Sequence, residues 1–284
     1  KYTKGKKYDF FIGDLLTFLG RLKGVPSLYP TDDVIRQVPE QSIFLFTCNY
    51  IIAPAITELG FFNKKKINYD GYKALAYLHP NIFSFDVSKI DNRYLKNKMF
   101  FIRCTGFGAT HDIGRKGIDN EVLTKIVDLI GNRGNIVISS ERELPEQYKK
   151  YQYTGKKNDI FHYMAYSEIF ICDSVSMCAE AAMLGTPVVE YDDYWFEMEQ
   201  LLELQHKYKL VNLFQPPNLK PMLEKINEII NTPSYKGNIK KKRDKFIEEK
   251  INVSDFLTWF FVNYPKSSLE YKKSPFVQYK FKHF

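Results

Sequence analysis

The sequence predicts an α/β protein built on parallel β-sheets. Short apolar segments typical of buried strands alternate with segments typical of helices along most of its 284 residues, a pattern that favours parallel strands joined by helical crossovers. Glycine-rich or polar segments follow several of the expected strands, as at the carboxyl edge of an open α/β sheet, where ligands bind. A chain of this length has room for two domains. We therefore expect Rossmann-like sheets with a binding site at a carboxyl edge.

The strand predictions rest on short apolar runs bounded by turn residues. The expected strands span residues 8–12, 27–29, 43–47, 99–104, 135–139, 169–172, 187–191 and 210–213. Helical patterns lie between them, at residues 15–22, 119–130, 160–166, 177–184 and 197–208. The strands from residue 99 onward are the clearest set, and we expect them in one sheet. Beyond Pro217 the pattern turns helical, over residues 220–230, a basic segment at 236–250, and residues 254–262.

The expected domain boundary lies near residue 85, within a connecting region that runs from about Gly71 to Arg93. Residues 1–85 would then form a partial N-terminal Rossmann-like domain with three strands, which is small for half of a two-domain α/β protein. We expect the chain to begin inside that domain. Residues 86–284 would form a C-terminal Rossmann-like domain with a helical extension.

The cysteines and the apolar runs indicate a reduced protein without a membrane span. Cys48, Cys104, Cys172 and Cys178 lie at apolar strand-like or helix-like positions without Cys-x-x-Cys spacing. We expect them to be core residues, and neither disulfide partners nor zinc ligands. No apolar run approaches the length that crosses a bilayer, and we expect a cytoplasmic protein.

The net charge of +8 lies in the two ends of the chain. Residues 1–7 contain four lysines, and residues 265–284 carry five lysines and one glutamate, so the interior is close to neutral. Basic tails fit a solvated terminus, a phosphate-rich partner or peripheral contact with a membrane surface. We find no nucleic-acid-binding motif and expect no nucleic-acid partner.

The segment 169–193 is the most informative about function. A strand ends in a polar elbow that contains Ser174 and Ser176, and the apolar helix that follows carries one carboxylate, Glu180. We expect this helix to be buried, and an ionised buried carboxylate is costly without a hydrogen-bonding partner. The free N–H groups at a helix N-terminus suit an anion. These features predict a phosphate at the elbow and a hydroxyl-bearing group, such as a ribose, beside Glu180.

The same residues have a purely structural interpretation. Ser174 or Ser176 would then only cap the helix, and Glu180 would pair with a lysine or a backbone amide elsewhere. The position of the elbow after a parallel strand weighs against this alternative, because ligands bind at that edge of a sheet.

A glycine-rich segment follows the expected strand 99–104. Glycines at four positions between residues 106 and 117 allow a ligand to approach the backbone closely. Within this segment, Arg115 and Lys116 offer anion contacts, and His111 offers an acid–base group. The alternative is a connecting loop without a ligand. Both loops follow strands of one expected sheet, so both would line the same site.

Further polar residues follow neighbouring strands. Ser139, Ser140 and Glu141 come at the end of the strand 135–139, where they either face the ligand or cap the next helix. His162 lies among aromatic residues, where a histidine is more often part of the core. Asp192 and Asp193 either reach sugar hydroxyls or form a turn.

The chain contains four distinctive segments: GYKALAYLHPNIF (71–83), GATHDIGRKG (108–117), IVISSERELPEQYKKY (136–151) and CDSVSMCAEAAMLGTPVVEYDDYW (172–195). Together they resemble a bacterial and archaeal family of unknown function that is related to glycosyltransferase-B enzymes and to the non-hydrolysing UDP-N-acetylglucosamine 2-epimerases. The resemblance covers residues from about 8 to 213. It implies a glycosyltransferase-B-like fold, in which two Rossmann-like domains face a cleft and the C-terminal domain holds a nucleotide sugar.

The resemblance also implies roles for individual residues. Ser174 and Ser176 lie where the epimerase relatives have a Ser-Gly-Gly phosphate cradle, and Glu180 matches the acid that holds the ribose hydroxyls. His111 and Arg115 lie where those relatives carry a His-Arg pair near the diphosphate. The cradle departs from the pattern, because residues 175 and 176 are Val and Ser in place of glycines, so the approach to the diphosphate would differ.

These observations lead us to expect a UDP-sugar-dependent glycosyltransferase that needs neither a cofactor nor a metal. Its partners would be a nucleotide-sugar substrate and a sugar or lipid-linked acceptor. Ser174, Ser176 and Arg115 or Lys116 would stabilise the leaving diphosphate, and His111 would act as the acid–base group. The N-terminal domain of such enzymes supplies the acceptor site. We do not find in this sequence the segment expected for the first part of that domain. A 2-epimerase and a non-catalytic nucleotide-sugar-binding protein are the alternatives.

Overall fold

The computed structural model describes residues 7–36, 38–106, 116–193, 196 and 198–282. The chain divides into two compact units, of which the first comprises Lys1–Ala76 with Lys250–Phe284 and the second Tyr77–Glu249. The division therefore lies nine residues before the expected boundary at residue 85. Of the helical extension that we expected for the second domain, the part up to Glu249 belongs to the second unit, and Lys250–Phe284 belongs to the first.

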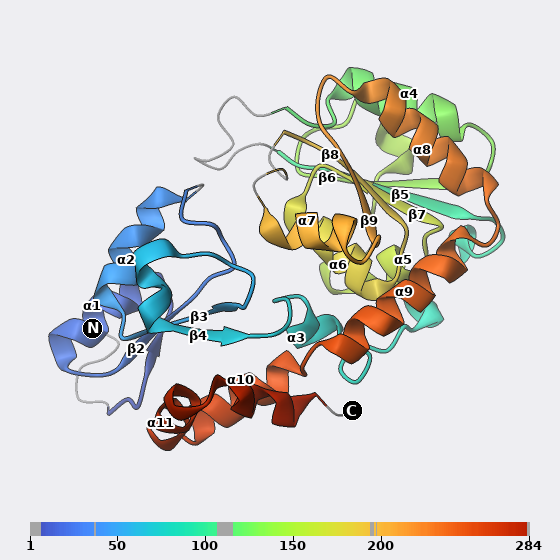
Figure 1. Ribbon diagram of the computed structural model, residues 1–284. Coiled ribbons are helices and arrows are strands. Elements are labelled where there is room, and N and C mark those ends of the chain that lie inside the picture. The colour runs from blue at the N-terminus through green and yellow to red at the C-terminus, as the bar shows by residue number, and fades with distance from the viewer. Residues whose placement is uncertain (1–6, 37, 107–115, 194–195, 197, 283–284) are drawn as a thin grey trace. The chain divides into compact units, whose positions relative to one another are not determined.

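The first unit contains a four-stranded parallel sheet in the order β1-β2-β3-β4 (Figure 1). Its strands are β1 (Phe11–Ile12), β2 (Ser27–Pro30), β3 (Tyr50–Pro54) and β4 (Lys66–Tyr69). Its helices are α1 (Asp14–Lys23), α2 (Ser42–Thr47), α10 (Val253–Val262) and α11 (Lys266–Lys273), and α3 (Leu75–Leu78) spans the division between the units.

The strand expected at residues 43–47 is wrong, because these residues form the helix α2. Leu45 is fully buried, whereas Ile43 and Phe46 are 55% and 60% exposed, so this short apolar run presents only one face to the core. The strand lies instead at β3, which begins three residues after the last residue of α2, and β4 was not predicted. Short apolar runs do not distinguish a strand from a helix by periodicity alone.

The C-terminal residues complete the first unit through specific contacts. The Lys250 ammonium forms an ion pair with Asp70 at 2.9 Å, and the hydroxyl of Tyr271 accepts a hydrogen bond from the Asn68 N–H at 3.0 Å. The Asp70 N–H donates to the Gln278 side chain at 2.7 Å. Phe256 and Phe260 of α10 are fully buried. These contacts join residues about 200 positions apart, which local sequence patterns do not reveal.

The second unit contains a five-stranded parallel sheet in the order β6-β5-β7-β8-β9. Its strands are β5 (Met99–Cys104), β6 (Asn135–Ser140), β7 (Ile169–Cys172), β8 (Val188–Tyr191) and β9 (Val211–Phe214), all within a residue of the predicted positions. Its helices are α4 (Asn120–Ile130), α5 (Ile160–Tyr166), α6 (Val175–Leu184), α7 (Glu199–His206), α8 (Leu219–Asn231) and α9 (Tyr235–Glu249).

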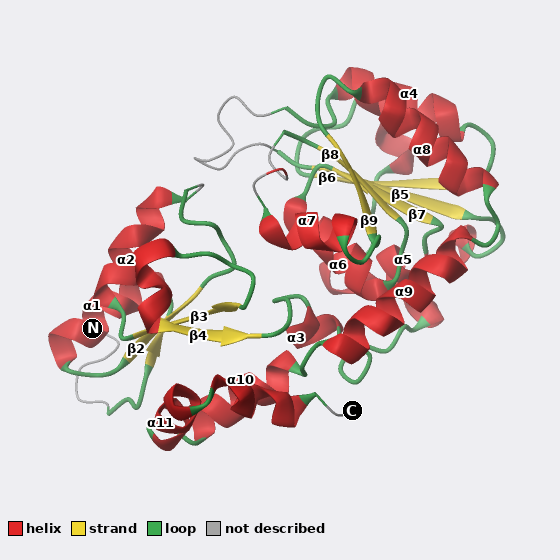
Figure 2. Ribbon diagram, viewed as in Figure 1, coloured by secondary structure: helices red, strands yellow, loops and turns green. Residues whose placement is uncertain are grey.

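Helices cover both faces of this second sheet (Figure 2). Alternate strand residues such as Phe100, Ile102 and Ile171 pack with α4 and α8 in one apolar cluster. The helices α5 and α6 cover the other face. A parallel sheet buried on both faces explains why its strands are rich in apolar residues. Short 3-10 helices complete the connections, at Pro39–Gln41, Gly60–Lys65, Val87–Lys89, Asn92–Tyr94, Glu146–Tyr151, Lys157–Asp159 and Pro275–Phe281.

All four cysteines are buried and free, as expected. Among the described residues, no helix is both long enough and apolar enough to cross a membrane.

Candidate functional site

The elbow after β7 presents the N-terminus of α6. Ser174 is the N-cap residue, with extended backbone (φ −138°, ψ 103°), yet its side chain makes no capping hydrogen bond within the described part of the chain. Ser176, in the first turn, is exposed. The first N–H groups of a helix have no acceptor inside the helix. The capping alternative therefore does not account for the Ser174 hydroxyl, and an anion-binding role for the elbow is consistent with this geometry.

The helix α6 is buried on every side but one. Seven of its ten residues are buried, as the apolar sequence predicts. The three that are not buried are Ser176, Met177 and Glu180. Residues three and four apart lie on the same face of a helix, so these three side chains form one accessible stripe that starts at the helix N-terminus. We call it the α6 stripe.

Glu180 is half-buried, so the expectation of a fully buried carboxylate is wrong. The hydroxyl of Tyr77 donates a hydrogen bond to its Oε1 at 2.6 Å. This bond orients the carboxylate while leaving the residue partly accessible. The tyrosine ring lies 5.8 Å from the ring of Phe161, and this contact restricts the position of the tyrosine ring. Sequence reasoning did not identify Tyr77, because 103 positions separate it from Glu180.

Asp173 connects the elbow to both ends of the glycine-rich segment. Its carboxylate accepts hydrogen bonds from the Thr105 N–H at 2.7 Å and from the Ile118 N–H at 3.1 Å. Burial raises its pKa to about 6, and the two backbone hydrogen bonds oppose that rise. Sequence reasoning missed this residue. The available signal was an acidic residue placed directly between a buried strand and a buried helix.

His111 and Arg115 lie outside the described residues. Lys116 is described, and its backbone pairs with Asp193 after β8: the Lys116 N–H donates to the Asp193 carboxylate at 3.2 Å, and the Asp193 N–H donates to the Lys116 carbonyl at 3.1 Å. The end of the glycine-rich segment is thus tied to the end of β8, on the carboxyl edge of the sheet. Asp193 acts here as a turn residue, which was one of its two expected roles.

The residues at the end of β6 contact protein groups. Arg103 of β5 donates to the Ser139 hydroxyl at 2.8 Å and forms an ion pair with Glu141. Glu141 also accepts a hydrogen bond from the Gly106 N–H at 3.0 Å. The Ser140 hydroxyl donates to the carbonyl of Arg142 at 2.7 Å. Ser139 and Glu141 therefore hold Arg103 and the start of the glycine-rich segment, and Ser140 closes a turn.

His162 is half-buried and has aromatic neighbours, as its sequence context indicates. Its Nδ1 accepts a hydrogen bond from the Asp86 N–H at 3.1 Å, and its ring lies 4.9 Å from that of Phe83. A cavity of about 560 Å³ lies in the same unit, next to the amino ends of β5 and β7, with Met99 and Glu168 in its wall. Of the predicted site residues that the structure describes, none lines it.

Solved structures share this fold. The S. aureus protein MnaA, solved with UDP, is similar with a TM-score of 0.65 and 13% identity over 91% of this chain and 76% of that one. A UDP-GlcNAc 2-epimerase from Neisseria meningitidis, bound to UDP-GlcNAc, is similar with a TM-score of 0.56 and 14% identity, over 87% of this chain and 77% of that one. The spinosyn rhamnosyltransferase SpnG, complexed with thymidine diphosphate, is similar with a TM-score of 0.54 and 12% identity, over 86% of this chain and 71% of that one.

These similarities, at such low identity, establish the fold alone. The chain has the two parallel sheets of glycosyltransferase-B enzymes and UDP-GlcNAc 2-epimerases, as its sequence predicts. No curated protein matches it significantly in sequence. Residues 23–255 match the family described as "Protein of unknown function (DUF354)", and the chain belongs to that family.

Proposed function

We propose that the chain binds a nucleoside diphosphate sugar at the carboxyl edge of the second unit's sheet and transfers the sugar to an acceptor. The single observation that carries this proposal is the α6 stripe. An otherwise buried helix leaves accessible only an N-terminal serine, a methionine and a carboxylate. Solved relatives of the same fold hold UDP, UDP-GlcNAc and thymidine diphosphate.

The stripe matches the order of groups in a nucleotide. The diphosphate would accept hydrogen bonds from the first N–H groups of α6 and from the hydroxyls of Ser174 and Ser176. Glu180 lies six positions after Ser174, a rise of about 9 Å along the helix, which would bring the carboxylate level with the ribose. A carboxylate accepts hydrogen bonds from two neighbouring hydroxyls. Tyr77 would hold it in that orientation.

The chemistry would be electrostatic stabilisation of a leaving group. As the bond between the sugar and the diphosphate breaks, negative charge develops on the β-phosphate. N–H groups and hydroxyls fixed at a helix N-terminus stabilise that charge without reorganising. Lys116 would supply a cation to this site. From the sequence, we expect Arg115 to supply a second cation and His111 to supply the acid–base group.

The proposal predicts a loss of UDP affinity in Glu180→Ala. Removal of a hydrogen bond to a charged group costs about 1.5–3 kcal/mol, so the Kd for UDP measured by calorimetry should rise about tenfold or more. The matched control is Glu224→Ala, which removes an exposed carboxylate on α8 and should leave the Kd unchanged. Equal affinities of wild type and a folded Glu180→Ala variant would contradict the ribose assignment.

A 2-epimerase is the second candidate, because the epimerase structure shares the fold to the same degree as the transferase structure. The two activities differ in their need for an acceptor. Incubation with a UDP-sugar alone, followed by NMR of the sugar, distinguishes them. Without an acceptor, inversion at one carbon of the sugar identifies an epimerase, whereas a transferase leaves the UDP-sugar unchanged. Binding of UDP with no turnover of any UDP-sugar would point to a non-catalytic binding protein.

A further inference from the structure

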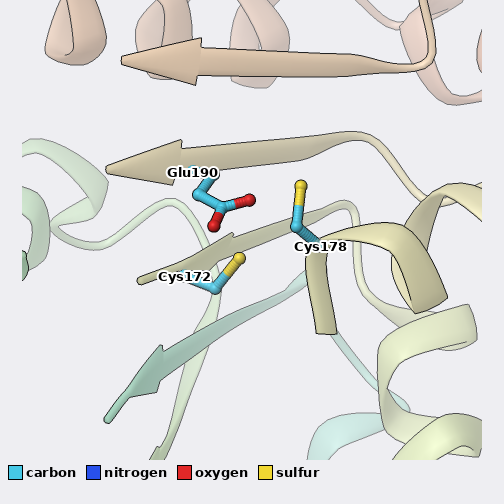
Figure 3. A group of neighbouring side chains, drawn as sticks. All are labelled: Cys172, Cys178 and Glu190. Atoms are coloured by element: carbon cyan, nitrogen blue, oxygen red, sulfur yellow. The ribbon is translucent and has the colours of Figure 1, made fainter. Parts of the chain in front are cut away.

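A cluster of three buried ligand-type side chains lies between α6 and the sheet of the second unit (Figure 3). It consists of Cys172, Cys178 and Glu190. The parallel register of β7 and β8 pairs Cys172 with Glu190, and α6 brings Cys178 over the same two strands (Figure 3). One sulfur from each cysteine and one oxygen from the glutamate all lie within 4.8 Å of one another.

The Glu190 carboxylate is the anomaly in this cluster. The residue is fully buried, and neither of its oxygens has a hydrogen-bond partner among the described residues. Both cysteines are fully buried as well. A buried carboxylate costs several kcal/mol unless it is neutralised, hydrogen-bonded or bound to a cation. Its neighbours include Asp192 and the two cysteine sulfurs, which are poor hydrogen-bond donors but good metal ligands.

We propose that Cys172, Cys178 and Glu190 bind a divalent zinc-type ion that holds α6 against β7 and β8. Two thiolates and a carboxylate are ligands that zinc accepts, at metal–sulfur distances of about 2.3 Å and metal–oxygen distances of about 2.1 Å. Ligand atoms around a tetrahedral ion then lie roughly 3.5–4 Å apart, so the three ligand atoms, which lie within 4.8 Å of one another, would draw closer on binding. Asp192, buried two residues after Glu190, is not part of this group of mutually close ligand atoms, so the fourth position would need a further ligand.

Protons leave when the metal binds. Burial raises the pKa of Glu190, with Asp192 and Cys172 nearby, and burial raises the pKa of Cys178. A divalent ion would displace the protons of two thiols and one carboxylic acid to solvent, and the three deprotonated ligands with the ion would carry a net charge of −1.

The location gives the ion a structural role. Cys172 ends β7 directly before Asp173, and Cys178 lies four residues into α6. An ion bound to both would fix the elbow between them. The Cys-x5-Cys spacing differs from the short spacings that usually indicate zinc. The sequence interpretation therefore placed all four cysteines in an ordinary core. This site stands independently of the proposed nucleotide site, because no ligand at the elbow is needed to form it.

The test measures metal directly. The full chain, purified without a histidine tag, is unfolded with chelator, refolded with zinc, freed of loose metal and analysed by mass spectrometry. Wild type should retain about one zinc per chain. Cys178→Ser and Glu190→Gln should retain less than about a fifth of that amount. Cys104→Ser is the matched control, because Cys104 is equally buried but belongs to the apolar cluster on the α4 face, and it should bind as wild type does.

Cobalt gives a second measurement that does not depend on the folding of any variant. Wild type refolded with cobalt should show the absorption of thiolate-to-cobalt charge transfer, and zinc should remove it. Absence of that absorption, with no zinc retained by wild type, overturns the proposal. Glu190 would then be a neutral buried acid, and Glu190→Gln, which is isosteric, would melt at the wild-type temperature or above it.

Discussion

At the residue scale, the candidate site depends on acids whose hydrogen-bond partners come from distant parts of the chain. Tyr77 lies 103 positions from Glu180, and Thr105 lies 68 positions from Asp173. The sequence indicates that Glu180 and the two serines face a ligand, because they interrupt an apolar helix. It does not indicate the partners, because local periodicity carries no information about which loops meet. The helix α6 was therefore predictable, but the hydrogen bond from Tyr77 that orients the Glu180 carboxylate was not.

Tyr77 provides a test of this support. Tyr77→Phe keeps the ring against Phe161 and removes only the hydroxyl that donates to Glu180. A carboxylate without this donor samples more orientations, so we expect the Kd for UDP to rise about three- to tenfold, the value of one hydrogen bond. Calorimetry measures this change. Tyr235→Phe, on α9, loses only a long contact of 3.5 Å with Asn212 and should bind UDP as wild type does. Unchanged affinity in Tyr77→Phe would remove the positioning role.

At the element scale, strands buried on both faces were the easiest to predict. The five strands of the second sheet are rich in apolar residues, and β7 is an uninterrupted apolar run, since helices cover both faces. The first sheet was harder, because α2 is a short apolar run with one buried residue, Leu45. The strand β4 alternates between buried and half-buried residues over only four positions. Such short segments fold as their tertiary contacts dictate.

The contact between α9 and α5 has a pH dependence that can be measured. Lys236 of α9 donates to the carbonyls of Tyr166 and Ser167 at the end of α5, at 2.8 and 2.7 Å. Burial lowers its pKa from 10.5 to about 8, while Glu168 opposes the shift and Lys240 adds to it. Between these two pKa values the unfolded chain binds more protons than the folded chain. The free energy of unfolding therefore rises with pH in this window.

The predicted rise in the free energy of unfolding is up to about 3 kcal/mol, which is the energy equivalent of the pKa shift of Lys236. A comparison of urea unfolding between wild type and Lys236→Met, from about pH 7 to about pH 10, isolates the contribution of Lys236 from those of other titrating groups. The stability difference between wild type and variant should be constant below about pH 8 and should then shift in favour of wild type. Parallel curves for the two proteins over the whole range would show that Lys236 stays protonated and solvated.

At the scale of the whole molecule, the chain leaves the first unit after residue 76 and returns to it at residue 250. Sequence reasoning assigned the helices after residue 217 to the second domain because they follow it along the chain. The contacts that place residues 250–284 elsewhere are polar and specific, as in the pairs Lys250–Asp70 and Tyr271–Asn68. The family match ends at residue 255, so it covers only the start of this segment.

Removal of residues 250–284 should therefore destabilise one unit and spare the other. A chain that ends at Glu249 loses the partners of Asn68 and Asp70 and the buried rings of α10, and each buried aromatic side chain lost costs about 3–5 kcal/mol. Amide hydrogen exchange, followed by mass spectrometry, should become at least about tenfold faster in β3 and β4. Exchange in β7 and α6 should match the full chain, because the core of the second unit lies within residues 77–249. Faster exchange in β7, with β4 unaffected, would assign the segment to the second unit and reverse this division of the molecule.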